Sequence, residues 1–316
     1  MKKLFAIISI LISVILLYLV LRPSNFQELE MLKKDYASET SAFFKFNNYE
    51  YHYTQKGQGV PLIFIHGLAG NAFLWDTLIN KIDSGYQCIA LDLPGFGLSD
   101  LDLKHAEKDL SNYFLEVFKA LLVEKGIDSF HLLGSSMGGY ISMDLAVKLQ
   151  DRTQSLTLSN PLCYDVKKAG GVFAQLAQGV LFKLIESKGL PLWISKIIYS
   201  NTTVEQIAEK DIRIRNVLNN KKITFDFIKL LFKNRNIVKN DLAKKVSVPT
   251  MIIWGNKDKI ISPTYAERLE RDIENSKSIM YKDIGHLSFY ENVDQFKIDM
   301  MSLITTLPDS NHHSLN

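Results

Sequence analysis

The chain has 316 residues, of which 47% are apolar, and its formal net charge at pH 7 is only +3. This length and apolar content are enough to bury a large core, and the nearly balanced charge shows no signature of nucleic-acid binding. Neither the number nor the spacing of the two cysteines, Cys88 and Cys163, suggests a metal site, and their contexts do not suggest a disulfide. We expect no metal and no other cofactor, and no obligate protein partner is evident.

Residues 1–24 differ from the rest of the chain. The segment Leu4–Leu21 contains eighteen residues without a charge, preceded by Lys2 and Lys3 and closed by Arg22. As a helix it would span about 27 Å, at the short end of what crosses a bilayer. Because it lacks a small-residue cleavage site, we expect an uncleaved transmembrane anchor, with a cleaved signal peptide as the alternative. The N-terminal lysines favour a cytoplasmic N-terminus, so the remaining chain is expected outside the cytoplasm. In a bacterial host this is the periplasm or the cell surface, and in a eukaryotic host it is the lumen or the outside of the cell.

After the anchor, short apolar segments alternate with segments of helical periodicity. Residues 25–48 are polar and mildly helical, and we interpret them as a linker. Strands are expected, in chain order, at residues 51–54, 62–65, 88–93, 130–134 and 154–159. Helices are expected at residues 72–82 and 105–125, the second with its apolar side chains on one face. Strands that alternate with helices in this way predict a mainly parallel sheet flanked by helices.

A long segment, residues 162–248, interrupts this alternation. It is rich in aromatic residues and helix formers, so we expect a helical cap inserted between the two parts of one α/β core, residues 49–161 and 249–307. Residues 308–316 follow as a polar tail. The cap contains 16 Lys and Arg against 7 Asp and Glu, a net charge of +9, which leaves −6 for all other residues. This predicts either a solvated basic surface or one drawn to anionic lipid head groups.

The segment Gly134–Gly138 has the pattern Gly-x-Ser-x-Gly, with Ser136 at its centre. An apolar run, Phe130–Leu133, ends just before it, and a helix-like segment begins at Tyr140. A serine on such a tight strand-to-helix turn presents its oxygen above the sheet, and the glycines beside it allow the sharp bend. Since a serine hydroxyl is a poor nucleophile at neutral pH, it also needs a base and a third group that orients the base.

In the fold that uses such a serine, the acid and then the histidine follow it along the chain. Asp258 comes after an apolar strand that ends at Gly255, and His286 comes after a second strand that ends at Tyr281. Both therefore lie just past the carboxyl ends of strands, where side chains meet ligands in an open parallel sheet. Asp272 and Asp283 fit this position less well, and His66 precedes the serine. We expect Ser136, Asp258 and His286 to be the catalytic residues.

Acyl transfer also requires backbone donors for the oxyanion that forms. One is expected from Met137, the residue after the nucleophile. The other is expected from Leu68, in the turn His66–Gly70 that follows the strand at residues 62–65. These two residues are the predicted substrate-binding groups, and no metal ligand is predicted.

Taken together, these segments resemble the α/β-hydrolase family over residues 51–307. The matching pieces are His66-Gly67, Asp92–Ser99, Gly134–Gly139, Trp254–Asp258 and Gly285-His286. The resemblance implies an α/β-hydrolase fold, with Ser136 as nucleophile, Asp258 as acid, His286 as base, and Leu68 and Met137 as oxyanion donors. The strand-end Asp92 belongs to a loop common across the family, and we interpret it as structural.

Within the family the chain looks most similar to lipases and esterases with a helical cap, including the membrane-anchored, monoacylglycerol-lipase-like branch. It also resembles carbon–carbon bond hydrolases of ring-cleavage products, which share the Gly-x-Ser-Met-Gly-Gly run. Epoxide hydrolases and haloalkane dehalogenases use aspartate where this chain has Ser136. We therefore expect a serine hydrolase of carboxylic, lipid-like acyl esters that meets the membrane through its N-terminal helix. A carbon–carbon bond hydrolase, or a ligand-binding protein on a hydrolase scaffold, is the alternative.

Overall fold

A computed structural model of the chain describes residues 28–164, 200, 222–233 and 238–307. The expected anchor (residues 1–24), most of the expected cap and the polar tail (residues 308–316) lie outside these residues. Among the helices that are described, none is long and apolar enough to cross a membrane.

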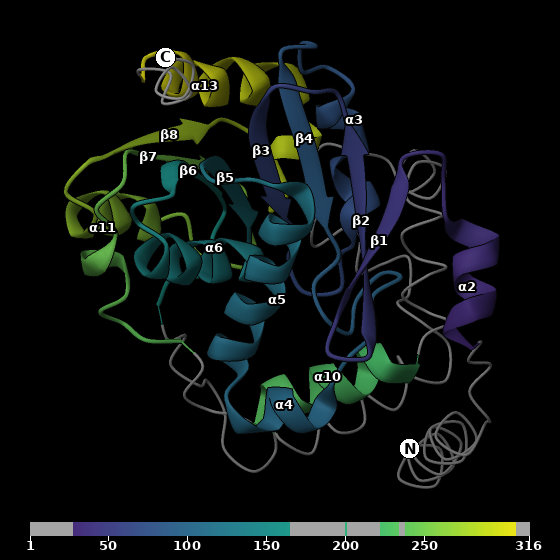
Figure 1. Cartoon of the computed structure of the whole chain (residues 1–316). Helices are drawn as coiled ribbons and strands as arrows, with labels where there is room; N and C mark the ends of the chain where they lie inside the picture. Colours follow the sequence, from purple (N-terminus) through teal and green to yellow (C-terminus); the bar gives the residue numbers. More distant parts are fainter. Residues whose placement is uncertain (1–27, 165–199, 201–221, 234–237, 308–316) are drawn as a thin grey trace, which may run out of the picture.

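The described strands form one eight-stranded sheet in the order β1-β2-β4-β3-β5-β6-β7-β8 (Figure 1). Strand β2 runs antiparallel to β1 and β4, and every other pair of neighbouring strands is parallel. The strands are β1 Ser41–Phe46, β2 Tyr49–Lys56, β3 Val60–Ile65, β4 Tyr86–Leu91, β5 Phe130–Ser135, β6 Thr153–Ser159, β7 Thr250–Gly255 and β8 Ser276–Tyr281. The predicted mainly parallel sheet is confirmed.

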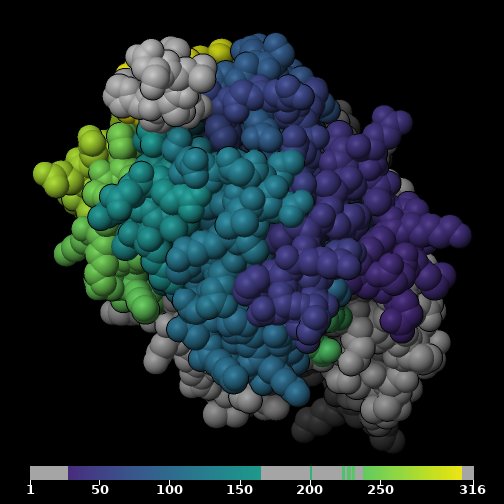
Figure 2. Space-filling model, in the orientation of Figure 1, coloured from purple at the N-terminus to yellow at the C-terminus, as the bar shows by residue number. Residues whose placement is uncertain are grey.

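Helices flank this sheet on both faces. The described helices are α2 Leu29–Tyr36, α3 Asp76–Ile79, α4 Leu103–Lys108, α5 Leu110–Lys125, α6 Met137–Lys148, α10 Lys222–Lys233, α11 Tyr265–Asp272, α12 Ser288–Glu291 and α13 Val293–Thr305, with 3-10 turns at Ala72–Trp75 and Ala243–Lys245. Along β5, Phe130 and Leu132 belong to the apolar cluster that contains residues of α5 and α6, whereas Leu133 belongs to the cluster with α3 and α13. Both faces of the strand are buried, as in a parallel sheet covered by helices. Figure 2 shows the face covered by α5 and α6 as a continuous surface beside the N-terminal strands.

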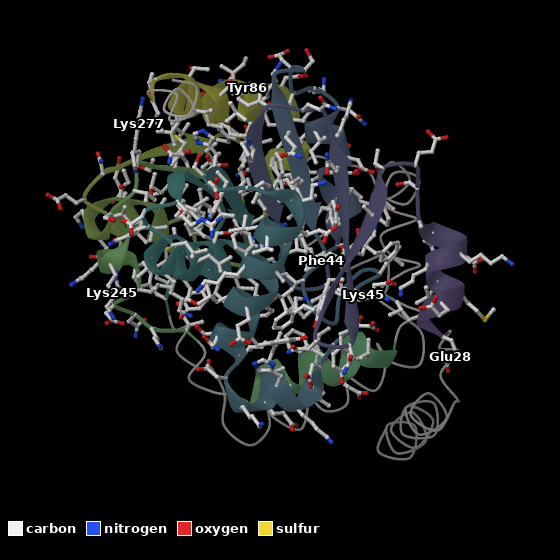
Figure 3. The ribbon with its side chains drawn as sticks, viewed as in Figure 1. Glu28, Phe44, Lys45, Tyr86, Lys245 and Lys277 are labelled. Atoms are coloured by element: carbon white, nitrogen blue, oxygen red, sulfur yellow. The ribbon has the colours of Figure 1, made fainter. Side chains whose placement is uncertain are left out.

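The segment expected as a linker contains part of the sheet. Strand β1 pairs antiparallel with β2, for example Phe44 with Tyr51, so the sheet begins at Ser41 and not at the expected boundary of residue 49. The side chain of Phe44 is buried, whereas its neighbour Lys45 is exposed (Figure 3). Only part of the strand is buried, so its sequence carries a weak strand signal. The pairing with β2 stabilises it.

The helix expected at residues 105–125 is two helices, α4 and α5. The break lies at Asp109, whose backbone is extended and whose side chain accepts a hydrogen bond from Asn112 N–H at 3.0 Å. An aspartate in this position caps the start of a helix more favourably than it continues one. Gly126 ends α5 in the left-handed conformation, with φ of 62°.

One described helix of the expected cap, α10, packs against the core. The ring of Phe227 meets Phe96 edge-on at 5.4 Å and Phe114 at 6.1 Å between centroids. The hydroxyl of Thr224 also donates to the carbonyl of Gly95. These contacts attach α10 to the loop that follows β4 and to α5, on the side of the molecule where α4 lies (Figure 1).

Candidate active site

Ser136 stands on a strained turn between β5 and α6. Its backbone has φ of 55° and ψ of −123°, a conformation that non-glycine residues rarely adopt. The glycines beside it are required by space, because a Cβ on Gly134 would lie 2.3 Å from the hydroxyl oxygen of Ser142. A Cβ on Gly138 would lie 2.4 Å from the carbonyl oxygen of Ile65. The predicted nucleophile elbow is therefore present as a backbone geometry, and the serine side chain is partly exposed.

The elbow is tied to the end of β6 and, through it, to the histidine loop. Ser136 N–H donates to the carbonyl of Ser159 at 3.1 Å, and Ser136 C=O accepts from Leu162 N–H at 2.8 Å. The hydroxyl of Ser159 in turn lies 2.8 Å from that of Ser288, two residues after His286. The carboxyl ends of β5, β6 and β8 therefore meet at one edge of the sheet, as the sequence predicts for Ser136 and His286.

The loop after β3 passes directly beside the elbow. A Cβ on Gly67 would lie 2.9 Å from Ser136 Cβ and 3.4 Å from Ser136 Oγ. Leu68 follows in this loop, and Met137 is the first residue of α6, where backbone N–H groups have no partner within the helix. The structure thus brings both predicted oxyanion donors to the turn that carries Ser136. Their role as donors stays a prediction.

Asp258 lies beyond the end of β7 with its carboxylate fully buried. Five donors reach its two oxygens: Asn160 Nδ2, Trp254 Nε1 and His286 Nδ1 at Oδ2, and the backbone N–H groups of Ile260 and Ile261 at Oδ1. Burial alone would raise the pKa of this carboxyl, but the hydrogen bond and charge of His286, with the other donors, hold the pKa below its usual value. The group is therefore a carboxylate at neutral pH. Its burial also distinguishes it from an ordinary aspartate in an exposed polar turn.

His286 is oriented by this carboxylate. Its Nδ1 lies 2.8 Å from Asp258 Oδ2, and only about 6% of the residue is exposed. Because an ionised carboxylate can only accept, Nδ1 donates this hydrogen bond, and Nε2 is the ring nitrogen that could act as a base. The structure brings together the acid and the base that the sequence predicts 28 residues apart.

His66 has a different role. It is fully buried, its Nδ1 lies 2.7 Å from the carbonyl of Gly67, and its Nε2 accepts from Leu93 N–H at 3.0 Å. Burial lowers the pKa of this imidazole, although the charge of Asp92 opposes the shift. Both ring nitrogens are thus used to hold the loop that contains Leu68.

Sequence reasoning missed Asn160, which follows β6. This residue is fully buried, and its Nδ2 donates to Asp258 Oδ2 at 2.8 Å and to the carbonyl of Gly285 at 3.2 Å. It adopts a positive φ of 46°, which asparagine tolerates better than most residues. The only local signal was an asparagine at the end of a predicted strand. Its contacts with residues 98 and 125 positions away could not be inferred from it.

A second buried His–Asp pair lies at the other end of the sheet. His52 Nδ1 is 2.6 Å from Asp92 Oδ2, and His52 Nε2 is 2.8 Å from Ser41 Oγ. Asp92 also accepts from the backbone N–H groups of Ala72 and Leu98. These bonds hold the loops after β3 and β4, which agrees with the interpretation of Asp92 as structural.

Within the described residues, no three His, Cys, Asp or Glu side chains are grouped so as to hold a metal ion. The thiols of Cys88 and Cys163 are buried and form no disulfide. Burial raises the pKa of each thiol to about 12, so neither is a thiolate at neutral pH. The serine remains the candidate nucleophile at this edge of the sheet.

Comparison with known proteins identifies the family. Residues 60–293 match the sequence profile of the alpha/beta hydrolase fold. The chain is 25% identical over 268 residues to a 2-hydroxy-6-oxononadienedioate/2-hydroxy-6-oxononatrienedioate hydrolase of Klebsiella pneumoniae, a match that spans 78% of this chain and 87% of that protein. It is 26% identical over 260 residues to lipase 3 of Moraxella sp., spanning 74% of each.

Among solved structures, a putative lipase from Acinetobacter baumannii superposes with a TM-score of 0.68. The match covers 89% of this chain and 96% of that protein at 22% identity, and it shows a shared fold. The profile covers well over half of the chain and contains the elbow, Asp258 and His286. The chain belongs to the α/β-hydrolase fold family.

Proposed function

We propose that this protein is a serine hydrolase that cleaves carboxylic esters with apolar acyl groups through an acyl-enzyme on Ser136. The observation that carries the proposal is the 2.8 Å hydrogen bond between Asp258 and His286, at the sheet edge where Ser136 occupies a strained elbow. This arrangement supplies a nucleophile, a base and the group that orients the base.

The reaction follows from these roles. As Ser136 Oγ attacks the ester carbonyl, His286 Nε2 takes the hydroxyl proton, and Asp258 stabilises the imidazolium. The backbone N–H groups of Leu68 and Met137 stabilise the oxyanion. His286 then gives its proton to the leaving alcohol, and the carbon–oxygen bond of the ester breaks. In the second half, His286 activates a water molecule, which attacks the acyl-enzyme, and the carboxylic acid leaves as Ser136 regains its proton.

The residues beside the catalytic groups support an apolar substrate. Leu68, Met137, Leu162 and Leu287 adjoin the oxyanion loop, the elbow and the histidine, and all four are only partly buried or exposed. The segments 66–70, 134–138, 161–163 and 284–288 contain no Lys or Arg. A substrate with two carboxylates would need compensating cations where it is buried. The similarity to a lipase also supports an ester substrate.

The test is turnover of p-nitrophenyl esters of graded acyl length, together with labelling by a fluorophosphonate probe. We expect ester hydrolysis, and we expect one labelled serine that is lost in Ser136→Ala. Absence of ester hydrolysis by a protein that is folded and labelled would contradict the substrate class. Full biological activity of Ser136→Ala would instead favour a ligand-binding role.

A carbon–carbon bond hydrolase is the second candidate, because the relative from Klebsiella pneumoniae has that activity by name and its match spans 87% of that protein. The same serine, acid and histidine would serve, with water cleaving a carbon–carbon bond beside a ketone. The ester series measured in parallel with a 2-hydroxy-6-oxo-dienoic acid separates the two. Preferred turnover of the dienoic acid would replace the ester proposal.

We also propose that residues 1–24 anchor the protein in a membrane, with the catalytic domain outside the cytoplasm. The uncharged segment 4–21 and the lysines before it support this topology. The full chain should fractionate with membranes, whereas residues 25–316 should not. External protease should reach the catalytic domain of intact spheroplasts. If the basic cap is drawn to lipid, residues 25–316 should bind anionic vesicles more strongly than neutral ones.

A further inference from the structure

Glu291, the last residue of α12, joins two segments that are distant in the sequence. Its Oε1 accepts a hydrogen bond from Gly285 N–H at 2.9 Å, and its Oε2 accepts one from Ser200 N–H at 2.8 Å. Gly285 immediately precedes His286, and Ser200 belongs to the segment expected as the cap. One carboxylate therefore accepts hydrogen bonds from the backbone of the histidine loop and from that of Ser200.

The backbone at Gly285 is consequently held on both sides. Glu291 binds its N–H, and Asn160 Nδ2 binds its C=O at 3.2 Å. These bonds restrain the peptide planes before and after this residue, and the second of those planes leads directly into His286. Asn160 also donates to Asp258, so this one side chain holds both the acid and the backbone next to the histidine.

The chemistry of the carboxylate suits this role. Hydrogen bonds to an ionised acceptor are shorter and stronger than those between neutral groups, and a carboxylate can accept at both oxygens simultaneously. Gly285 N–H donates to Oε1 and Ser200 N–H donates to Oε2, so the orientation of the carboxylate is itself restrained. A glutamine at this position could accept through one oxygen only.

We propose that Glu291 is a positioning residue for the reaction, one that sets the imidazole of His286 by holding Gly285 N–H. This inference rests on the proposed function, because it assigns His286 the role of base. Misplacement of a catalytic group by about 1 Å can lower a rate by about 100-fold. Loss of Glu291 should therefore lower kcat for short esters while leaving their KM nearly unchanged.

The test compares substitutions at Glu291 with the same substitutions at Glu270. Glu270 is a matched control, because its carboxylate also accepts two hydrogen bonds, from Ser278 N–H at 2.9 Å and from Ser278 Oγ at 2.6 Å. It lies on α11, and neither of these bonds involves the histidine loop. The variants are Glu291→Ala, Glu291→Gln, Glu270→Ala and Glu270→Gln, each measured for kcat, KM, Tm and the rate of fluorophosphonate labelling.

We expect Glu291→Ala to lower kcat and the labelling rate by about 10-fold to 100-fold. Glu291→Gln should recover part of this loss, because its remaining oxygen can accept from Gly285 N–H. Both Glu270 variants should keep the kcat of the wild-type protein, even if their Tm is lower. Equal kcat in Glu291→Ala and Glu270→Ala, or a change confined to KM or Tm, would overturn the proposal.

Failure of the proposed function gives a different pattern. If the wild-type protein is labelled at Ser136 but hydrolyses no ester, the ester proposal falls, and the labelling rates of the four variants still decide the role of Glu291. If the wild-type protein is not labelled at all, Ser136 is not an activated nucleophile, and both proposals fall together.

Discussion

The described part of the molecule contains two arrays of serine, histidine and aspartate, at different places along one sheet. In the first, Asp258 orients His286 near the elbow of Ser136. In the second, Asp92 and Ser41 bind the two nitrogens of His52 at 2.6 Å and 2.8 Å. Both arrays have a buried carboxylate against Nδ1 of the histidine. The identity of the three residues therefore does not distinguish a reactive site from a structural one.

The surroundings of the serine distinguish them. Ser136 lies between a strand and a helix with a positive φ, beside the loop of Gly67 and the first N–H groups of α6. Ser41 begins strand β1, and its hydroxyl oxygen already accepts a hydrogen bond from Ser38 N–H at 2.9 Å. His52 is completely buried and packs against Phe43 and Phe73. An activated serine requires an exposed elbow with oxyanion donors, whereas the second array fastens two loops to the sheet.

The largest expected difference concerns the two serines. Ser136→Ala should lower kcat by about 10⁴-fold or more, because removal of a serine nucleophile leaves only binding and the oxyanion hole. Ser41→Ala, the matched control, should keep kcat within about twofold and should still be labelled by a fluorophosphonate. Labelling of Ser136→Ala, or loss of labelling in Ser41→Ala, would invert the assignment of the two arrays.

Substitutions of the two histidines should affect different properties: His52→Ala should mainly lower stability, and His286→Ala should mainly lower activity. His52→Ala removes the imidazole that lies 2.6 Å from the buried carboxylate of Asp92, and the loss of a hydrogen-bond partner by a buried group costs about 1–3 kcal/mol of unfolding free energy. His286→Ala should abolish ester hydrolysis with a smaller change in stability, because Asp258 keeps four other donors, from Asn160, Trp254, Ile260 and Ile261, whereas Asp92 keeps those of Ala72 and Leu98. Urea unfolding and kcat measured on both variants give the comparison. A larger loss of stability in His286→Ala than in His52→Ala would count against it.

A substitution of Asn160 tests how strongly kcat depends on the orientation of Asp258. Asn160→Ala removes the amide that donates to Asp258 and to the carbonyl of Gly285, so we expect kcat to fall by about tenfold with a small change in KM. The measurement is the steady-state rate on a short ester. His131→Ala is a control, because His131 Nδ1 lies 2.8 Å from Ser155 Oγ, between neighbouring strands β5 and β6. An unchanged kcat in Asn160→Ala would show that the backbone donors of Asp258 suffice.

The smallest effect concerns acid stability. The pKa of His66 is lowered in the folded protein by burial, so its contribution to stability is complete above its unfolded pKa of about 6.5 and is lost as the pH falls through the lower folded value. The lowered pKa values of Asp258 and Asp92 add a further loss, which begins only below about pH 4.

His66→Gln removes the first of these contributions. Unfolding free energies at pH 7.5, 6 and 5 should therefore decline less steeply in the variant, by about 1.4 kcal/mol for each unit by which the pKa is lowered. Wild-type and variant proteins are compared by urea unfolding at each pH. Parallel declines would mean that His66 does not titrate in this range.

Much of the site could be predicted because its signals are local. A serine on a strained elbow requires small residues close to it, and Gly134 and Gly138 lie two positions before and after Ser136 in the chain. The acid and the base follow apolar strands, so their place at the carboxyl edge of a parallel sheet also follows from the pattern. The alternation of strands and helices predicted that sheet, which the structure contains.

Other features depended on partners that the sequence does not place nearby. Strand β1 was assigned to a linker because half-buried side chains carry a weak signal, and pairing with β2 makes it part of the sheet. Asn160 and the array of Ser41, His52 and Asp92 acquire their roles from contacts between residues 11 to 125 positions apart, and Glu291 acquires its role from contacts 6 and 91 positions away. By itself the sequence determined the elbow, the order of its partners and the parallel sheet, because each depends on local backbone geometry and periodicity. Only the tertiary structure decided which polar side chains surround the acid and the histidine, because strand order and register bring them together.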